Sequence, residues 1–380
     1  MTRSTFIAAI IGTATVFRRD PPVDFPPMPG PSAASLHAVE ATADDRSVAV
    51  PLARRSGTSV AVADLARWIS GEADREPVLG ADAAMQFVHR WTRSHEENFP
   101  VLSSLVPPRV RDGFAAVYAF CRAADDLGDE AGDPALASEM LGWWRQDLER
   151  AFDPVRQPRH PVFIALRSIA ERHRLEAKPF HDLLDAFELD QVKTRHATWD
   201  EVIAYCRKSA DPVGRIVLRL FGEREDAETL AASDAVCTGL QLANHWQDIR
   251  RDLEARDRIY VPMEVVSIDR FEERLRATAA GGFACDATFL AESRELVRGL
   301  VDRTWPFFER GRELLGRISP EARPVVELFV EGGEAVLRRI ESWDFETVLH
   351  RPRVSRAAKA LMVGRAWVRS RLAQRRSPSA

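Results

Sequence analysis

Apolar residues recur at helical spacing almost without a break from Ala84 to near the end of this 380-residue chain. Alanine, leucine, arginine and glutamate dominate the pattern, and the alternating β-branched runs typical of strands are scarce. Helices are expected near residues 84–94, 111–130, 135–152, 160–173, 178–191, 199–221, 227–254, 286–317, 320–342 and 355–373. With 45% hydrophobic residues available to fill a core, the pattern predicts an all-α fold, a single helical bundle.

The two ends of the chain differ in composition from the main helical domain, which is expected over residues 81–350. Residues 1–80 include a proline-rich stretch and are expected to be a disordered extension, although residues 62–69 could form a short helix. Residues 351–380 hold eight arginines and Lys359 but no acid. They are expected to form a basic amphipathic helix and tail. This helix either makes peripheral contact with an anionic membrane or packs on the bundle with its arginines in solvent.

Charge and cysteine content narrow the class of protein. A formal net charge of −4 argues against a nucleic-acid partner. The four cysteines form no Cys-x-x-Cys pair, so neither a zinc site nor a disulfide framework is indicated. A reducing, cytoplasmic location fits best, and no apolar run reaches the ~18 residues of a transmembrane helix. No glycine-rich dinucleotide fingerprint follows a predicted strand, so NADPH is not expected.

Three aspartates, Asp125, Asp126 and Asp129, stand in an otherwise apolar run. On a helix, Asp125 and Asp129 lie one turn apart on the same face. Two stacked acids repel each other, so beside Phe120 and Leu127 they require a cation or full exposure to water. The run therefore predicts either a cation site or a solvated helix face.

A second stretch repeats this acidic spacing. Asp248 and Asp252 are four residues apart, and Asn244 lies one turn earlier on the same face. Hard oxygen ligands of this kind suit Mg²⁺, and two such helices facing each other can hold the metal together with a diphosphate. Basic and hydrogen-bonding side chains are at hand to neutralise the remaining negative charge of such a ligand: Arg122, Arg258, His95 and Gln241.

Other interpretations of the acidic pairs remain open. Each pair alone is typical of a solvated helix face, which would fit a non-catalytic scaffold at a membrane surface with the basic tail as its active part. A carboxylate-bridged di-iron bundle typically uses Glu-x-x-His, and no histidine of this chain has glutamate three residues before it. Two acidic pairs in apolar segments favour the cation site.

A proline interrupts one of the expected helices. Pro212 lies within residues 199–221, where it removes a backbone hydrogen bond and should bend or break the helix. With Gly214 beside the break, a bulky apolar ligand could pass close to the backbone. Alternatively, Pro212 merely ends one helix and starts another. His245, about 100° around the helix from Asn244, is expected to pack inside the bundle.

Two longer motifs resemble those of a known family. They are Tyr118-x-x-Cys-Arg122-x-x-Asp125-Asp126-x-x-Asp129 and Gln241-x-x-Asn244-x-x-x-Asp248-x-x-x-Asp252, the latter followed by Asp257-Arg-Ile-Tyr260. The motifs resemble the two aspartate motifs of squalene and phytoene synthases, which condense prenyl diphosphates head to head. The resemblance covers roughly residues 84–350. It implies a class I isoprenoid synthase fold with a central hydrophobic cavity, and Mg²⁺-dependent chemistry on C15 or C20 prenyl diphosphates.

Finer matches point to one branch of this family. They are His95-x-x-Asn-Phe-Pro, Tyr205-Cys-x-x-Ser-Ala-x-Pro-Val-Gly-Arg215 and Asn244-x-Trp-Gln-Asp248, which look most like the HpnC-type enzymes of bacterial hopanoid pathways. That resemblance implies ionisation of presqualene diphosphate and capture of the cation by water, giving hydroxysqualene and diphosphate. A presqualene diphosphate synthase and a hydroxysqualene-reducing flavoprotein would be the pathway neighbours. The rival reaction is complete condensation of two prenyl diphosphates to squalene, dehydrosqualene or phytoene.

The resemblance also implies a role for individual residues. Metal ligands are implied at Asp125, Asp129, Asn244, Asp248 and Asp252, with Asp126 as a supporting acid of the metal site. Diphosphate contacts are implied at Arg122, His95, Gln241, Arg258 and Tyr260, and Tyr118 is implied to lie near the reacting carbons. Many family members carry arginine just before the first aspartate of the second motif, where this chain has Gln247. Because an amide lacks the positive charge of a guanidinium, our hypothesis is that Gln247 favours the second half-reaction only.

Overall fold

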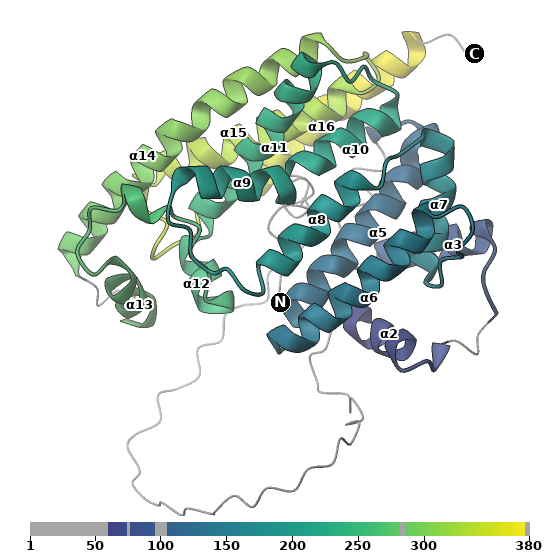
Figure 1. Ribbon diagram of the computed structural model, residues 1–380. Helices are drawn as coiled ribbons and strands as arrows, with labels where there is room; N and C mark the ends of the chain where they lie inside the picture. Colours follow the sequence, from purple (N-terminus) through teal and green to yellow (C-terminus); the bar gives the residue numbers. More distant parts are fainter. Residues whose placement is uncertain (1–59, 74–76, 96–104, 282–285, 377–380) are drawn as a thin grey trace, which may run out of the picture.

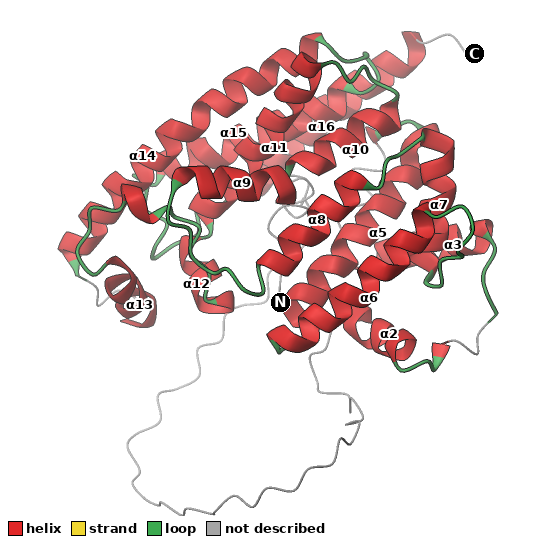
Figure 2. Cartoon of the chain, viewed as in Figure 1, coloured by secondary structure: helices red, strands yellow, loops and turns green. Residues whose placement is uncertain are grey.

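The computed structural model describes residues 60–73, 77–95, 105–281 and 286–376. Within these ranges every regular element is a helix, and a single isolated bridge joins Arg195 to Ile259 (Figure 2). The helices are α2 (Val60–Ile69), α3 (Ala81–His95), α5 (Pro108–Glu130), α6 (Pro134–Phe152), α7 (Pro161–His173), α8 (Lys178–Leu189), α9 (Trp199–Ser209), α10 (Asp211–Phe221), α11 (Ala227–Gln247), α12 (Ile249–Arg256), α13 (Phe271–Gly281), α14 (Ala287–Arg312), α15 (Arg323–Ser342) and α16 (Arg356–Arg376), with two short 3₁₀ turns, η2 (Met263–Val265) and η3 (Glu313–Gly316). The prediction of an all-α fold is confirmed.

Two central helices organise the bundle (Figure 1). Helix α5 is buried without interruption from Gly113 to Leu127 and packs against α2, α3, α6, α7, α8 and α10. Helix α11 is buried from Ala235 to Gln247 and packs against α9, α10, α14 and α15. A helix that is apolar on all sides needs neighbours on all sides. The first motif therefore lies on an enclosed helix and the second runs from the enclosed α11 into α12, so their acids are not on solvated faces.

The region expected as one helix over residues 199–221 is two helices, α9 and α10, which meet at Ala210. Pro212 lies in the first turn of α10, where its missing N–H has no helical partner to lose. The simpler alternative for Pro212 is therefore correct. A Cβ at Gly214 would lie 2.7 Å from the Cys237 sulfur of α11. This glycine therefore allows close packing of α10 on α11 and also lines an apolar pocket of about 360 Å³, so the expectation that it leaves room for a ligand stays a prediction.

The region expected as one helix over residues 227–254 also divides, at Asp248 between α11 and α12. The backbone of Asp248 departs from helical values (φ −111°, ψ 17°). Hydrogen bonds nevertheless continue across the break, from Asp248 N to Asn244 O at 2.9 Å and from Asp252 N to Asp248 O at 2.8 Å. The one-turn spacing of the three side chains is kept, while the chain bends at the middle one. Helix α13 lies where no helix was expected.

The helical unit is longer than residues 81–350. Helix α2 packs against α5 and buries Val62 and Leu65 in the core, so the bundle begins before residue 81. At the other end, α16 packs along α15 and buries Ala366. The proline-rich stretch lies outside the described residues. Among the described helices, none combines the length and the apolar character needed to cross a bilayer.

A close approach of α11, α14 and α15 yields a stability prediction. Gly333 of α15 faces Phe308 of α14, and an added Cβ would overlap the Phe308 ring and lie 2.9 Å from Leu240 Cδ2 of α11. Gly333→Ala should therefore lower the free energy of unfolding by about 1–3 kcal/mol. Gly299→Ala, on α14 with no atom within 4 Å of the added methyl, is the control and should raise it slightly. Denaturant unfolding measures both, and equal effects would contradict the packing described.

Candidate active site

The acids of the first motif lie near the C-terminal end of α5, and two of them are buried. Asp125 is 5% exposed and Asp126 is 1% exposed. Burial, and next the negative charge of Asp129, raise the pKa of Asp125 well above its usual value. Burial raises the pKa of Asp126 to about 7 although Arg122, 2.7 Å away, opposes the shift. A cation close to these two buried carboxyl groups would lower the energetic cost of their ionisation.

The acids of the second motif lie at the junction of α11 and α12. Asp248 pairs with Arg351, from the segment before α16, and more distantly with Arg251 at 3.5 Å. Burial, and next the charge of Asp248, raise the pKa of Asp252. The Oδ2 atom of Asp252 is buried and has no hydrogen-bond partner among the described residues. An additional cation would satisfy this oxygen.

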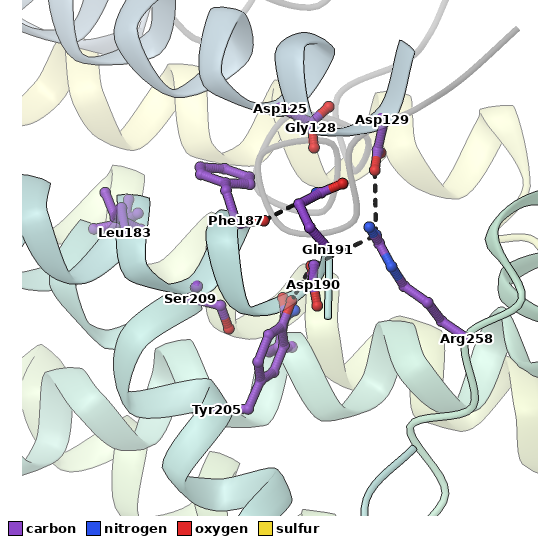
Figure 3. Close-up of a pocket in the computed structure, with 13 residues that line it drawn as sticks. Asp125, Gly128, Asp129, Leu183, Phe187, Asp190, Gln191, Tyr205, Ser209 and Arg258 are labelled. Atoms are coloured by element: carbon purple, nitrogen blue, oxygen red, sulfur yellow. Dashed lines mark hydrogen bonds and ion pairs between the residues drawn. The ribbon is translucent and has the colours of Figure 1, made fainter. Parts of the chain in front are cut away.

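The two motifs face each other across a pair of arginines. The Arg256 guanidinium lies 2.5 Å from Asp129 of α5 and 3.7 Å from Asp252 of α12. Arg258 reaches Asp129 at 3.2 Å, and Figure 3 shows it pointing toward α5 from the opposite side of the pocket. Burial opposes the charge of Arg258, but Asp190 and Asp129 raise its pKa overall. The expectation that the acidic stripes oppose each other therefore agrees with the geometry.

A pocket of about 520 Å³, partly open to solvent, lies beside the first motif and Arg258, whereas Asp248, Asp252 and Arg256 are not part of its lining (Figure 3). Its polar side carries Asp125, Asp129, Gln241 and Arg258, and its other wall is formed by α8, α9 and α10. Leu183, Phe187 and Val213 are among the apolar residues of that wall. A second pocket of about 360 Å³ with an almost wholly apolar lining shares Val213 with the first. Charged groups and apolar space thus meet at one place.

Comparison with known proteins identifies the family. The family model described as squalene/phytoene synthase matches residues 92–358, which include both aspartate motifs. The chain belongs to the squalene/phytoene synthase family. The hydroxysqualene synthase of Rhodopseudomonas palustris is 38% identical over 230 residues, covering 59% of this chain and 72% of that protein. The hydroxysqualene synthase of Sinorhizobium fredii is 41% identical over 172 residues, covering 45% of this chain and 57% of that protein.

A solved structure of the same family shares the fold. The crystal structure of squalene synthase HpnC from Alicyclobacillus acidocaldarius matches with a TM-score of 0.60 and 39% identity, covering 70% of this chain and 96% of that one. This likeness confirms the expected isoprenoid synthase type of helical bundle.

Sequence reasoning missed Asp190, which joins several groups of the site. Its carboxylate accepts hydrogen bonds from the Tyr205 hydroxyl at 2.9 Å and the Tyr260 hydroxyl at 3.2 Å. It also pairs with Arg258 at 3.5 Å. Burial raises the pKa of Asp190, and Arg258 opposes the shift. No spacing in the sequence links Asp190 to these partners. Asp190 stands at the end of α8, whereas Tyr205 is on α9 and Arg258 and Tyr260 follow α12.

Several residues with implied roles lie away from the pocket lining. Arg122 is engaged with Asp126, and Tyr118 and Asn244 are buried. The Tyr260 ring stacks on His245 with ring centres 3.8 Å apart, and its hydroxyl turns to Asp190. His245 is 1% exposed, in agreement with its expected place inside the bundle. His95 ends α3, and its side chain lies outside the described residues.

Gln247 contacts the segment that leads into α16. Its Nε2 donates to the Pro352 carbonyl at 2.5 Å, next to the pair formed by Arg351 and Asp248. The chain therefore supplies a guanidinium to the second motif from position 351, next to the neutral amide of Gln247. The hypothesis that Gln247 restricts the chain to the second half-reaction stays a prediction.

The donor set fits magnesium bound together with a phosphate ligand. Among the described residues, no three acidic, histidine or cysteine side chains converge on one point. Magnesium in proteins is commonly held by one or two carboxylates, with water and substrate phosphates completing its shell. The Asp125–Asp129 pair offers two carboxylates at the pocket lining, and the Asp248–Asp252 pair lies beyond the lining, joined to Asp129 through Arg256. The buried Oε1 of Gln241, on the pocket wall, likewise has no partner among the described residues.

A buried acid beside the pocket yields a pH prediction. Asp211 begins α10 between the pocket residues Ser209 and Val213, and accepts a hydrogen bond from Thr238 at 2.8 Å. Burial, and next Asp234, raise its pKa from 3.8 to about 8, and Arg215 opposes this. Between these values the folded chain holds a proton that the unfolded chain releases, so this group makes stability fall as pH rises.

Asp211→Asn should remove this contribution. The melting temperature of the wild type should fall more between pH 5 and pH 7.5 than that of the variant. Thermal unfolding followed by circular dichroism across this range is the measurement. Asp200→Asn, at an exposed position of α9, is the control and should follow the wild type. Parallel curves for wild type and Asp211→Asn would show that Asp211 titrates normally.

Proposed function

We propose that this chain converts presqualene diphosphate and water to hydroxysqualene and diphosphate. The bond between the cyclopropylcarbinyl carbon and the diphosphate oxygen breaks, and the oxygen keeps the electron pair. The carbon skeleton rearranges, water adds to the resulting cation, and one proton is released to solvent. Two relatives named hydroxysqualene synthase, at 38% and 41% identity, support this choice of reaction.

The observation that carries the proposal is the opposition of the two motifs across Arg256 and Arg258. A diphosphate leaving group is an anion, and it leaves most readily where positive charge is preorganised in a site that excludes bulk water. Arg258 lies at the pocket and Arg256 lies between Asp129 and Asp252. Both guanidinium groups would then bind the diphosphate in addition to these carboxylates.

Magnesium is the proposed cofactor. Asp125, Asp129, Asn244, Asp248 and Asp252 would hold it, with Asp126 as a supporting acid; when bound, the metal neutralises the diphosphate and makes it a better leaving group. The pocket walls have a different task. Leu183, Phe187 and Val213 line the space opposite the acids, where apolar and aromatic surfaces keep water from a carbocation.

The remaining implied roles are proposals as well. Gln241, on the pocket wall, and Arg258 would contact the diphosphate directly. Arg122, His95 and Tyr260 are proposed as further diphosphate contacts, and Tyr118 as a residue near the reacting carbons. Arg122 and Tyr260 would have to leave Asp126 and Asp190, respectively, to do so.

The proposed pathway places other proteins on either side of this reaction. A presqualene diphosphate synthase would supply the substrate, and a hydroxysqualene-reducing flavoprotein would consume the product. Both molecules carry a C30 hydrocarbon skeleton that prefers a bilayer to water. The proposed location is therefore the cytoplasm, at the inner face of the membrane.

A substrate comparison tests the reaction. The purified chain with Mg²⁺ should convert presqualene diphosphate to hydroxysqualene, identified by mass spectrometry, with release of one diphosphate per product. Farnesyl diphosphate alone should give no C30 product, because the first condensation is assigned to another protein. Formation of squalene, dehydrosqualene or phytoene from prenyl diphosphates alone would replace the proposal by complete condensation.

Aspartate variants test the site. Asp125→Asn and Asp248→Asn should each lower kcat for presqualene diphosphate by about 10²-fold or more, because each removes a carboxylate aimed at the cation site. The melting temperature should change little for Asp125→Asn and fall for Asp248→Asn, which removes the charge that pairs with Arg351, so kcat is measured well below both melting temperatures. The control is Asp112→Asn, which lies on the same helix as Asp125 and pairs with His89 at its partly exposed end. Wild-type kcat in both site variants would show that these carboxylates have no part in the reaction, and the absence of turnover in the wild type would favour a non-catalytic scaffold.

Asp190 should act by holding its neighbours. Asp190→Asn keeps an acceptor oxygen for one of the two tyrosines, which donate to different oxygens of Asp190, and removes the charge that faces Arg258. We expect kcat to fall about tenfold or more with the melting temperature kept, because a misplaced guanidinium stabilises the leaving group less. Asp182→Asn, on the same helix and paired with Lys178, is the control. Wild-type kcat in Asp190→Asn would show that the contact has no part in the reaction.

A further inference from the structure

Helix α16 has two apolar faces, and only one of them is used inside the molecule. The inner face packs along α15 with Ala366, and with Met362 and Val363 against the core (Figure 1). Ser370 on the same side donates to the Leu105 carbonyl at 2.7 Å. The expected alternatives for the basic helix, packing on the bundle or meeting a membrane, therefore do not exclude each other.

The opposite side of α16 presents large apolar side chains to solvent. Leu361, Val368 and Leu372 are 55%, 50% and 51% exposed, and their spacing of seven and four residues puts them on one helical face. Trp367 beside them is 44% exposed. Other strongly exposed valines of the described chain, such as Val155 and Val192, stand singly in loops. We call Leu361, Trp367, Val368 and Leu372, with the exposed Arg365 and Arg371, the outer face of α16.

The charge of this helix identifies the kind of partner. Helix α16 contains seven basic residues and no acid. On the side toward α15, Arg369 pairs with Glu327 and lies 3.6 Å from Glu331. Arg369 therefore neutralises acids of α15, whereas the outer side of α16 keeps its positive charge. Arg371 lies over the Trp367 ring, 5.2 Å from its centre. An apolar stripe flanked by arginines and a tryptophan matches the boundary between acyl chains and anionic headgroups.

We propose that the outer face of α16 docks this protein on an anionic lipid bilayer. The helix lies in the plane of the interface, with Leu361, Val368 and Leu372 among the acyl chains and the arginines at lipid phosphates. The family model ends at residue 358, within the first turn of α16. This surface is therefore a property of the chain beyond the part that the family model describes. The docking does not depend on the proposed reaction.

Vesicle flotation with the full chain tests the proposal. The wild type should float with vesicles of phosphatidylcholine and phosphatidylglycerol and not with phosphatidylcholine alone, and salt should weaken the binding. The triple variant Leu361→Ser, Val368→Ser, Leu372→Ser should bind about tenfold more weakly. Val155→Ser with Val192→Ser removes apolar side chains elsewhere that are even more exposed, and this variant should bind like the wild type.

A second pair of variants separates charge from apolar contact. Arg365→Gln with Arg371→Gln should lose the preference for phosphatidylglycerol, because the guanidiniums select the anionic lipid. Turnover in detergent should be the same for all these variants, since α16 holds none of the proposed site residues. The proposal is overturned if the wild type does not float with anionic vesicles or if the triple variant floats as well as the wild type. It is also overturned if light scattering shows a dimer that the triple variant abolishes without any vesicle binding.

Discussion

The contact of Arg256, the last residue of α12, with acids of both motifs is the interaction on which the rest of the site depends. Buried carboxylates are costly unless positive charge and hydrogen bonds compensate them. Arg256 lies between Asp129 and Asp252, one acid from each motif. Its positive charge thus holds the ends of α5 and α12 together, because the carboxylates of Asp129 and Asp252 would otherwise repel each other. The same concentration of negative charge that stabilises Arg256 suits a divalent cation with an anionic ligand.

The bundle is arranged so that these charged groups lie where apolar space begins. Helices α5 and α11 are enclosed over most of their length, and the pocket is lined by Asp125 and Asp129 at the end of α5 and by Gln241 of α11. Asp190 extends the charged network to the other wall, where Tyr205 and Tyr260 donate to it. His245 and His196 pack on the Tyr260 ring, and burial lowers the pKa of both histidines. Neutral rings therefore support a charged centre without competing with it.

The segment after α15 connects this centre to the surface of the molecule. Arg351 binds Asp248, and the next residue accepts a hydrogen bond from Gln247. A few residues later the chain enters α16, whose inner face completes the core and whose outer face is apolar and basic. A protein whose proposed substrate and product are largely hydrocarbon gains from a surface of this kind, because the ligand need not cross bulk water.

The sequence by itself determined the helical fold and the two aspartate motifs. Helical periodicity and one-turn spacing are local properties, so Asp125 with Asp129 and Asp248 with Asp252 could be paired before any coordinates were known. The family resemblance added the reaction class. The helix breaks at Ala210 and Asp248 were harder to predict from the sequence. Pro212 indicates a disturbed helix without saying whether it bends or ends, and an aspartate does not indicate a break.

Only the tertiary structure decided which charges meet. Asp190 joins Tyr205, Tyr260 and Arg258 because α8, α9 and the segment after α12 converge, and no spacing along the chain encodes that convergence. Arg351 compensates the charge of Asp248 from 103 residues away. The next residue, Pro352, accepts the hydrogen bond from Gln247. The two faces of α16 also needed the fold, because composition shows that a helix is apolar and basic but not which side its neighbours cover.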